Sequence, residues 1–135
     1  MSAYAAYVSF QEDTMIQERA LKIALVIVGL LFVATIYPLL RMPLEETLQM
    51  MLSLYVTLGI FLLLAARNPS AHRSLIAFAA WSSFAHGGVM AVQSIHDVGE
   101  REHLLIGTFA FVVIGAVLLS LTARAITATF APAPK

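Results

Sequence analysis

The sequence predicts an all-α fold, an integral membrane bundle of four antiparallel helices. Hydrophobic residues make up 60% of the 135 residues and charged residues 12%. Soluble domains are about 45–50% apolar and about 25% charged. The apolar excess falls in four blocks, and each block reaches the length of about 20 residues that a membrane-spanning helix needs. We therefore expect one compact domain surrounded by a lipid bilayer.

The chain divides into an arm, a membrane domain and a tail. We expect an N-terminal cytoplasmic arm over residues 1–19, disordered or lying at the membrane surface, a four-span domain over 20–124 and a disordered tail over 125–135. The predicted helices run over about 21–40, 47–66, 74–95 and 104–122. Pro38, near the end of the first helix, lacks a backbone donor and is expected to kink or close it.

Basic residues are distributed unequally between the two ends of the predicted bundle. One end carries Arg19, Lys22, Arg67, Arg73, Arg124 and Lys135, and the other carries Arg41 and Arg101. Cytoplasmic loops hold the excess of Lys and Arg, so we expect both termini in the cytoplasm and, for a bacterial protein, a multi-pass location in the inner membrane. The chain has no cysteine and a formal net charge of zero, which excludes thiolate metal sites and gives no basic patch for nucleic acid.

The third predicted span carries a polar face. Ser82, His86 and Gln93 follow steps of four and seven residues, so they share one face of a helix. Polar groups that face lipid lose their hydrogen-bond partners, so we expect this face to point into the bundle. The predicted partners lie on the second span and are Gln49, Ser53 and Tyr55. Two roles stay open for His86: a neutral imidazole that holds helices together, or a group that transfers protons or binds a ligand.

Glycines in the third and fourth spans predict close helix packing. Gly87 and Gly88 are adjacent in the third span, and Gly107 and Gly115 lie eight residues apart in the fourth. Small residues let helices approach closely inside a membrane.

We expect no cofactor. A b-type haem and a divalent metal are the two weak alternatives. Haem would need a second axial ligand besides His86, from Met50, Met51, Met90 or the His86 of another subunit.

The metal alternative rests on the loop between the third and fourth spans. His96, Glu100 and His103 would share one face if that loop were helical, and imidazole with carboxylate suits zinc and related ions. Gly99 interrupts the helical pattern, so we expect no metal site.

Several motifs give the chain a family resemblance. They are Gln49-Met50-Met51-Leu52-Ser53-Leu54-Tyr55-Val56-Thr57-Leu58-Gly59, Asn68-Pro69, Arg73-Ser74-Leu75, Trp81-Ser82-Ser83-Phe84-Ala85-His86 and Met90-Ala91-Val92-Gln93. The chain resembles, over roughly residues 20–121, a family of small, uncharacterised bacterial membrane proteins with four spans. The resemblance implies the fold and supplies no activity or catalytic residue.

The sequence offers no catalytic constellation. It contains no pairing of nucleophile and base, no phosphate-binding loop and no paired carboxylates within a span. The leading hypothesis is a non-catalytic accessory or interaction subunit, which forms a homo-oligomer or joins a larger membrane complex. The alternative is a small transporter or a proton- or ligand-binding module that uses His86, Ser82 and Gln93. A weaker alternative is a haem- or quinone-linked redox subunit.

Overall fold

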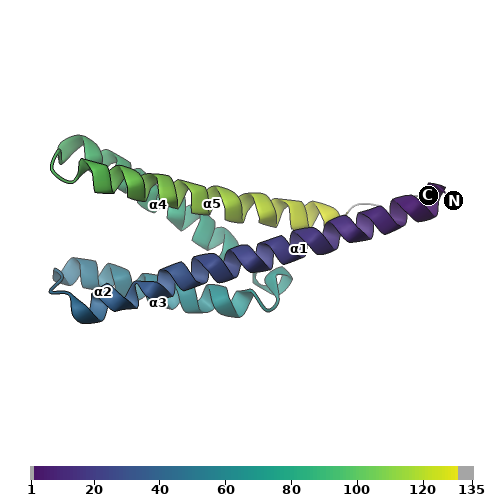
Figure 1. Cartoon of the computed structure of the whole chain (residues 1–135), viewed down its shortest axis with the longest axis horizontal. Helices are drawn as coiled ribbons and strands as arrows, with labels where there is room; N and C mark the ends of the chain where they lie inside the picture. The colour runs from purple at the N-terminus through teal and green to yellow at the C-terminus, as the bar shows by residue number, and fades with distance from the viewer. Residues whose placement is uncertain (1, 131–135) are drawn as a thin grey trace.

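The fold consists of long helices joined by short turns (Figure 1). A computed structural model describes residues 2–130. Its helices are α1 (Ser2–Ala34), α2 (Ile36–Arg41), α3 (Glu46–Ala65), α4 (Arg73–His96) and α5 (Arg101–Phe130), with a 3-10 turn η1 (Pro69–His72) before α4. By length and composition, the described residues form four segments able to cross a membrane: Tyr7–Arg41, Glu46–Ala65, Pro69–His96 and Arg101–Arg124. The predicted all-α bundle with four apolar helices is confirmed.

The first span is interrupted at Thr35, between α1 and α2. Pro38 has no N–H to donate to the carbonyl four residues earlier. The neighbouring bonds are kept, since Leu39 N donates to Thr35 O at 3.3 Å and Thr35 Oγ1 donates to Phe32 O at 2.7 Å. The kink expected from Pro38 therefore begins three residues before it.

Both ends of the chain are more helical than the sequence predicts. Instead of starting near residue 21, helix α1 starts at Ser2 and has 33 residues, a length of about 50 Å against a hydrocarbon core of about 30 Å. The expected arm is thus a continuation of the first helix. Lys22 Nζ and Glu18 Oε1, one helical turn apart, form an ion pair of 2.8 Å that stabilises it. Helix α5 runs to Phe130, into the expected tail. The rest of that tail, 131–135, lies outside the described residues.

The helices pack as two pairs. Helix α4 lies along α5, helix α1 lies along α3, and α1 with α5 joins the pairs. Leu21, Leu25, Val28 and Phe32 recur in steps of four, three and four along α1, and all are buried. Such a stripe faces one helix interface. Leu25, Leu62, Ile76 and Leu118, from four different helices, are fully buried in the resulting core.

Glycines set the closest approach within each pair. A Cβ added at Gly59 would lie 2.7 Å from Gly29 O, and one added at Gly29 would lie 3.0 Å from Gly59 O. In the other pair, a Cβ at Gly115 would lie 2.9 Å from Ala80 O. The backbones of α1 and α3, and of α4 and α5, approach within distances that a larger residue would prevent.

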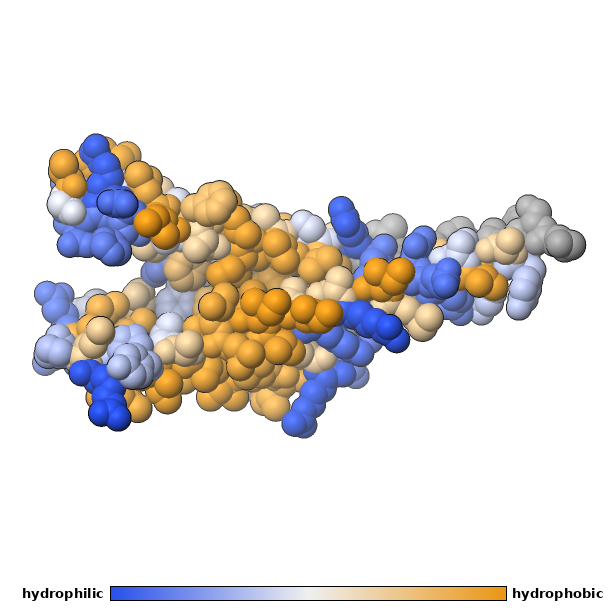
Figure 2. All heavy atoms as spheres, viewed as in Figure 1, coloured by the Kyte–Doolittle hydropathy of each residue, from blue (hydrophilic) through white to orange (hydrophobic). Residues whose placement is uncertain are grey.

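Figure 2 shows a wide apolar band with hydrophilic groups gathered towards the ends of the molecule. Large apolar side chains of the helices are exposed, including Leu54 at 71% and Phe109 at 73%. Exposed apolar area on this scale is expected where lipid covers a protein. We call the end of the bundle that carries residues 42–45 and 97–100 the loop end.

Candidate functional site

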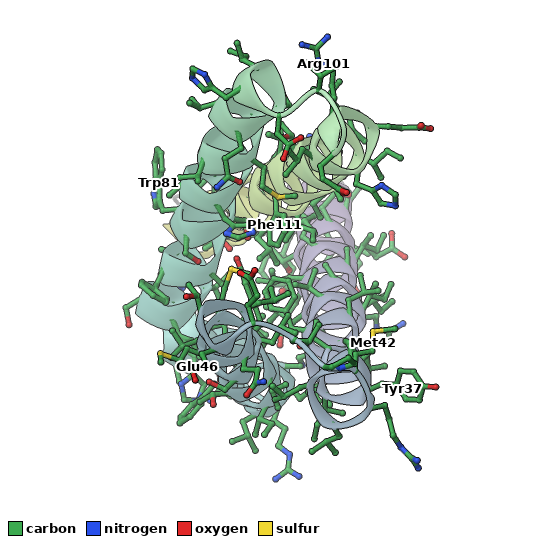
Figure 3. All side chains as sticks on the ribbon, turned by 90° about the vertical axis from the view of Figure 1, so that its left-hand side faces the viewer. Tyr37, Met42, Glu46, Trp81, Arg101 and Phe111 are labelled. Carbon is green, nitrogen blue, oxygen red and sulfur yellow. The ribbon has the colours of Figure 1, made fainter. Side chains whose placement is uncertain are left out.

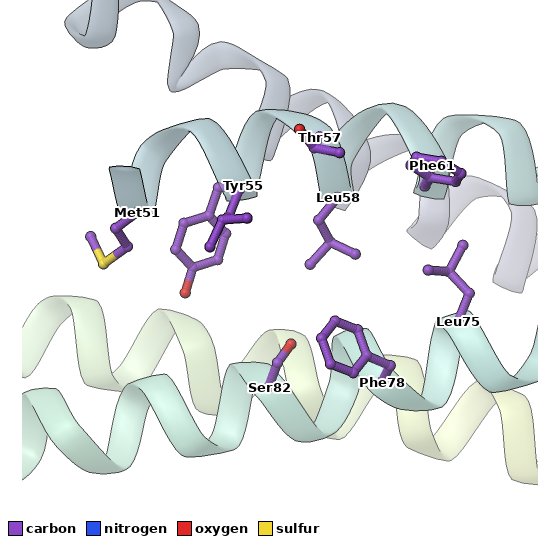
Figure 4. A pocket seen from close by; sticks show the side chains of 9 residues that line it. Met51, Tyr55, Thr57, Leu58, Phe61, Leu75, Phe78 and Ser82 are labelled. Atoms are coloured by element: carbon purple, nitrogen blue, oxygen red, sulfur yellow. The ribbon is translucent and has the colours of Figure 1, made fainter. Parts of the chain in front are cut away.

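A groove lies between α3 and α4, which belong to different helix pairs and contact each other far less than either contacts its own partner. Its volume is about 380 Å³. The lining side chains come from these two helices: Met51, Leu54, Tyr55, Thr57, Leu58, Phe61, Leu75, Phe78 and Ser82. Figure 4 shows Tyr55 and Leu58 of α3 facing Phe78 and Ser82 of α4 across the space between the helices. We call this space, with these lining residues, the α3–α4 groove.

Three hydroxyl groups line the α3–α4 groove, and they differ in what they bond. Thr57 Oγ1 donates to Ser53 O at 3.0 Å, and Ser82 Oγ donates to Ala79 O at 3.1 Å. Such bonds to the preceding helical turn are the usual way to satisfy these side chains. The Tyr55 hydroxyl has no hydrogen-bond partner among residues 2–130 and points across the groove towards α4 (Figure 4).

Four rings meet behind the groove, one from each long helix. His86 of α4 lies against Phe111 of α5, with ring centroids 4.4 Å apart, and against Tyr55 of α3 at 5.3 Å. Phe32 of α1 completes the group, 5.0 Å from Tyr55. These three pairs meet edge to face, a geometry that aromatic pairs prefer. Figure 3 shows Phe111 between the helices, with Trp81 on the outer side of α4. We call Phe32, Tyr55, His86 and Phe111 the ring cluster.

The ring cluster encloses His86 partly and offers it no polar partner. The side chain is half-buried. Its contacts are with the rings of Tyr55 and Phe111, and the described part of the chain provides no hydrogen bond to its nitrogens. The imidazole and the Tyr55 hydroxyl are therefore two polar groups at membrane depth whose hydrogen-bonding capacity is unused.

The structure brings together three of the six polar residues that the sequence selects. Ser82 and Tyr55 line the α3–α4 groove, and His86 lies beside Tyr55. Gln49, Ser53 and Gln93 are exposed instead of paired with the third span. Gln49 Nε2 donates to Leu44 O at 2.8 Å, and Ser53 Oγ donates to Met50 O at 2.6 Å. These two groups are satisfied by nearby carbonyls of their own segment, so they need no partner on α4.

The glycines expected at helix contacts behave differently from one another. Gly87 faces α5, where an added Cβ would lie 3.3 Å from Thr108 O. A Cβ added at Gly107 would lie 3.0 Å from Met90 Sδ. Gly88 does not pack, because a Cβ there would meet no atom within 4 Å. Being adjacent to Gly87, it points to a different side of the helix.

The sequence reasoning missed a polar link between α4 and α5. Thr108 Oγ1 lies within hydrogen-bonding distance of Gly87 O, at 3.3 Å, and of Leu104 O, at 2.8 Å. The sequence does not single out Thr108, because a threonine in an apolar span usually bonds to a carbonyl of its own helix.

The loop expected to carry the weak metal site is not helical. Helix α4 ends at His96 and α5 begins at Arg101, so His96 does not share a helical face with Glu100 and His103. Asp97 Oδ1 accepts hydrogen bonds from the backbone N–H groups of Gly99 and Glu100, at 3.0 and 3.2 Å. Within residues 2–130, no group of three or more His, Cys, Asp or Glu side chains could hold a metal ion.

Comparison with known proteins identifies the family. Residues 16–135 match DUF6632, a family of unknown function, and the chain belongs to it. No curated protein matches the chain, and no solved structure does.

Proposed function

We propose that this member of DUF6632 is a non-catalytic membrane protein that binds a lipophilic molecule within the bilayer, in the α3–α4 groove. The observation that carries the proposal is the groove itself, about 380 Å³ in volume, with a wall whose surface is almost entirely apolar. Ligand sites are typically about 300–1,000 Å³, mostly apolar, with a few placed polar groups. Tyr55 and Ser82 are such polar groups, so the ligand-binding alternative from the sequence is favoured over a purely accessory subunit.

The groove suits a small molecule, because its volume of about 380 Å³ lies within the range of about 300–1,000 Å³ that is typical of small-molecule sites. A hydrocarbon chain or a small ring system fits, and either can enter sideways from the lipid. An accessory role in a larger membrane complex is compatible with this binding, since the rest of the apolar surface remains open to partners.

The proposal includes a location in a bacterial inner membrane with both termini in the cytoplasm. The excess of Lys and Arg on the side of the termini supports this orientation. Helices α1 and α5 both extend away from the loop end (Figure 1), which agrees with termini on one side of the membrane. Reporter fusions at the C-terminus and after Gly99 test it. The C-terminal fusion should report the cytoplasm and the Gly99 fusion the opposite side. A cytoplasmic signal after Gly99 would refute the orientation.

The binding proposal is tested by identifying what co-purifies with the full chain. Native mass spectrometry of the protein released from lipid nanodiscs should show a bound small molecule, and extraction should identify it. Leu58→Trp places an indole in the groove and should abolish the adduct. Leu64→Trp is the matched control, because Leu64 lies on the same helix, is 47% exposed and does not line the groove.

Two results would contradict the binding proposal. The first is an adduct retained in full by a folded Leu58→Trp variant. The second is the absence of any adduct from wild-type protein prepared in native lipid. The visible absorption spectrum of the same sample tests the weaker haem-linked alternative. A Soret band would show bound haem and would favour that alternative over the proposal.

A further inference from the structure

We infer that the ligand of the α3–α4 groove is a neutral amphiphile: a hydrocarbon chain or ring bearing an uncharged carbonyl or hydroxyl head group, held at Tyr55 beside His86. This inference rests on the proposed function and specifies its ligand class. Long-chain alcohols and isoprenoid quinones share this chemistry.

The absence of charge on the groove wall argues for a neutral head group. None of the lining residues is Lys, Arg, Asp or Glu. A phosphate, carboxylate or ammonium group bound at membrane depth would lose its water and find no opposite charge, which is strongly unfavourable. The ligand's polar part is therefore uncharged when it occupies the groove.

The free hydroxyl of Tyr55 argues for an oxygen acceptor on the ligand. The hydroxyls of Thr57 and Ser82 already donate to carbonyls of their own helices. Tyr55 keeps its O–H for a ligand, and Ser82 keeps lone pairs that can accept a bond from a ligand hydroxyl. Contacts with the rings of Phe32, at 5.0 Å, and His86, at 5.3 Å, hold the Tyr55 ring in place, so its donor is oriented before the ligand arrives.

The distribution of polar and apolar side chains along the groove sets the direction of the ligand. Tyr55 and Ser82 lie towards one part of the groove, with the apolar Met51 beyond them on the side of the loop end, whereas Phe61 and Leu75 lie at the other part (Figure 4). The polar part lies nearer the loop end, where the surface is hollowed between the two helix pairs (Figure 2). The head group therefore points to the loop end, and the chain extends towards η1.

Photocrosslinking of the full chain in lipid nanodiscs tests this ligand class. The probe is a sixteen-carbon alcohol with a diazirine in its chain, and mass spectrometry maps the labelled peptides. Unlabelled hexadecan-1-ol, a short-tailed isoprenoid quinone, hexadecane and hexadecanoate compete at equal mole fractions. We expect labelling of α3 and α4, with the alcohol or the quinone competing about 2–10-fold better than hexadecane, the range of one net hydrogen bond. Whichever of these two competes better identifies the head group.

Two variants separate the hydroxyl of Tyr55 from general effects on the groove. Tyr55→Phe keeps the ring and removes the oxygen, so the preference for neutral oxygen-bearing competitors over hexadecane should disappear. Ser53→Ala is the control, because it removes an exposed hydroxyl from the same helix outside the groove. It should leave the preference intact.

The outcomes separate this inference from the proposed function. Competition by hexadecane equal to that by the alcohol and the quinone, or a preference that survives Tyr55→Phe, would overturn the head-group assignment and leave lipophilic binding in place. Strongest competition by hexadecanoate would overturn the neutral class. A lack of competable labelling on α3 and α4 would overturn both the inference and the proposed function.

Discussion

Replacing Gly59 with alanine should push α1 and α3 apart. The added Cβ would lie 2.7 Å from Gly29 O, 2.8 Å from Val33 N and 2.9 Å from Phe32 Cβ. Two of these atoms belong to the backbone of α1, so no change of side-chain rotamer relieves the contact. The helices must separate, and Phe32 would shift away from Tyr55 in the ring cluster.

The expected loss of stability is the difference between two opposing effects. Inserting a carbon into a close-packed contact typically costs about 1–3 kcal/mol. Alanine in place of glycine within a helix gains about 0.8–1.0 kcal/mol. Gly88→Ala isolates the second effect, because a Cβ there meets no atom within 4 Å. We therefore expect Gly59→Ala to be less stable than Gly88→Ala by about 1–3 kcal/mol.

Unfolding in mixed micelles with increasing SDS, followed by circular dichroism, measures this difference. Gly88→Ala should unfold at the same SDS fraction as wild type or a higher one, and Gly59→Ala should unfold at a lower SDS fraction than Gly88→Ala. If Gly59→Ala unfolds together with Gly88→Ala or after it, the close contact between α1 and α3 is refuted.

Three further predictions use the same preparation. Gly87→Leu and Gly115→Leu should each lower the melting temperature in detergent, because Gly87 packs against α5 and Gly115 packs against α4. Unchanged melting temperatures of both variants would place these glycines against lipid. Thr108→Val should cost about 0.6 kcal/mol, the average for interhelical hydrogen bonds in one measured membrane protein, and no loss would assign the Thr108 bond to Leu104 alone. His86→Gln should fold better than His86→Leu if a polar group at this position matters, and wild-type folding and ligand labelling in both variants would remove His86 from the site.

The sequence was sufficient for the number of spans and insufficient for the ends of the chain. Four apolar blocks of the right length predict four membrane helices, and the structure has them. This apolar pattern is required only within the hydrocarbon core, so it does not show where a helix ends outside the membrane. Residues 2–19 contain no glycine or proline, and a helix can continue through them into water without any hydrophobic pattern. Helix α1 therefore begins at Ser2, about 19 residues before the predicted start of the span.

The candidate site was predictable only in part, because a shared helix face does not specify which neighbour covers it. The spacing of Ser82 and His86 places them correctly on one face, and Ser82 reaches the α3–α4 groove. Gln93 continues that face towards the loop end, where the helix pairs diverge and the side chain is exposed. Phe32 and Phe111 were not predicted as part of the site, because the sequence does not show which residue of another helix an apolar side chain in a span contacts.

The ring cluster links the structural and the functional roles that the sequence leaves open for His86. Its imidazole packs on Phe111 at 4.4 Å and on Tyr55 at 5.3 Å, so it supports the ring whose hydroxyl faces the groove. A change at His86 should therefore alter ligand binding through the position of Tyr55 even if the imidazole never touches the ligand. His86→Gln combined with Tyr55→Phe separates the cases: effects that act through one hydroxyl are not additive, whereas independent contacts add.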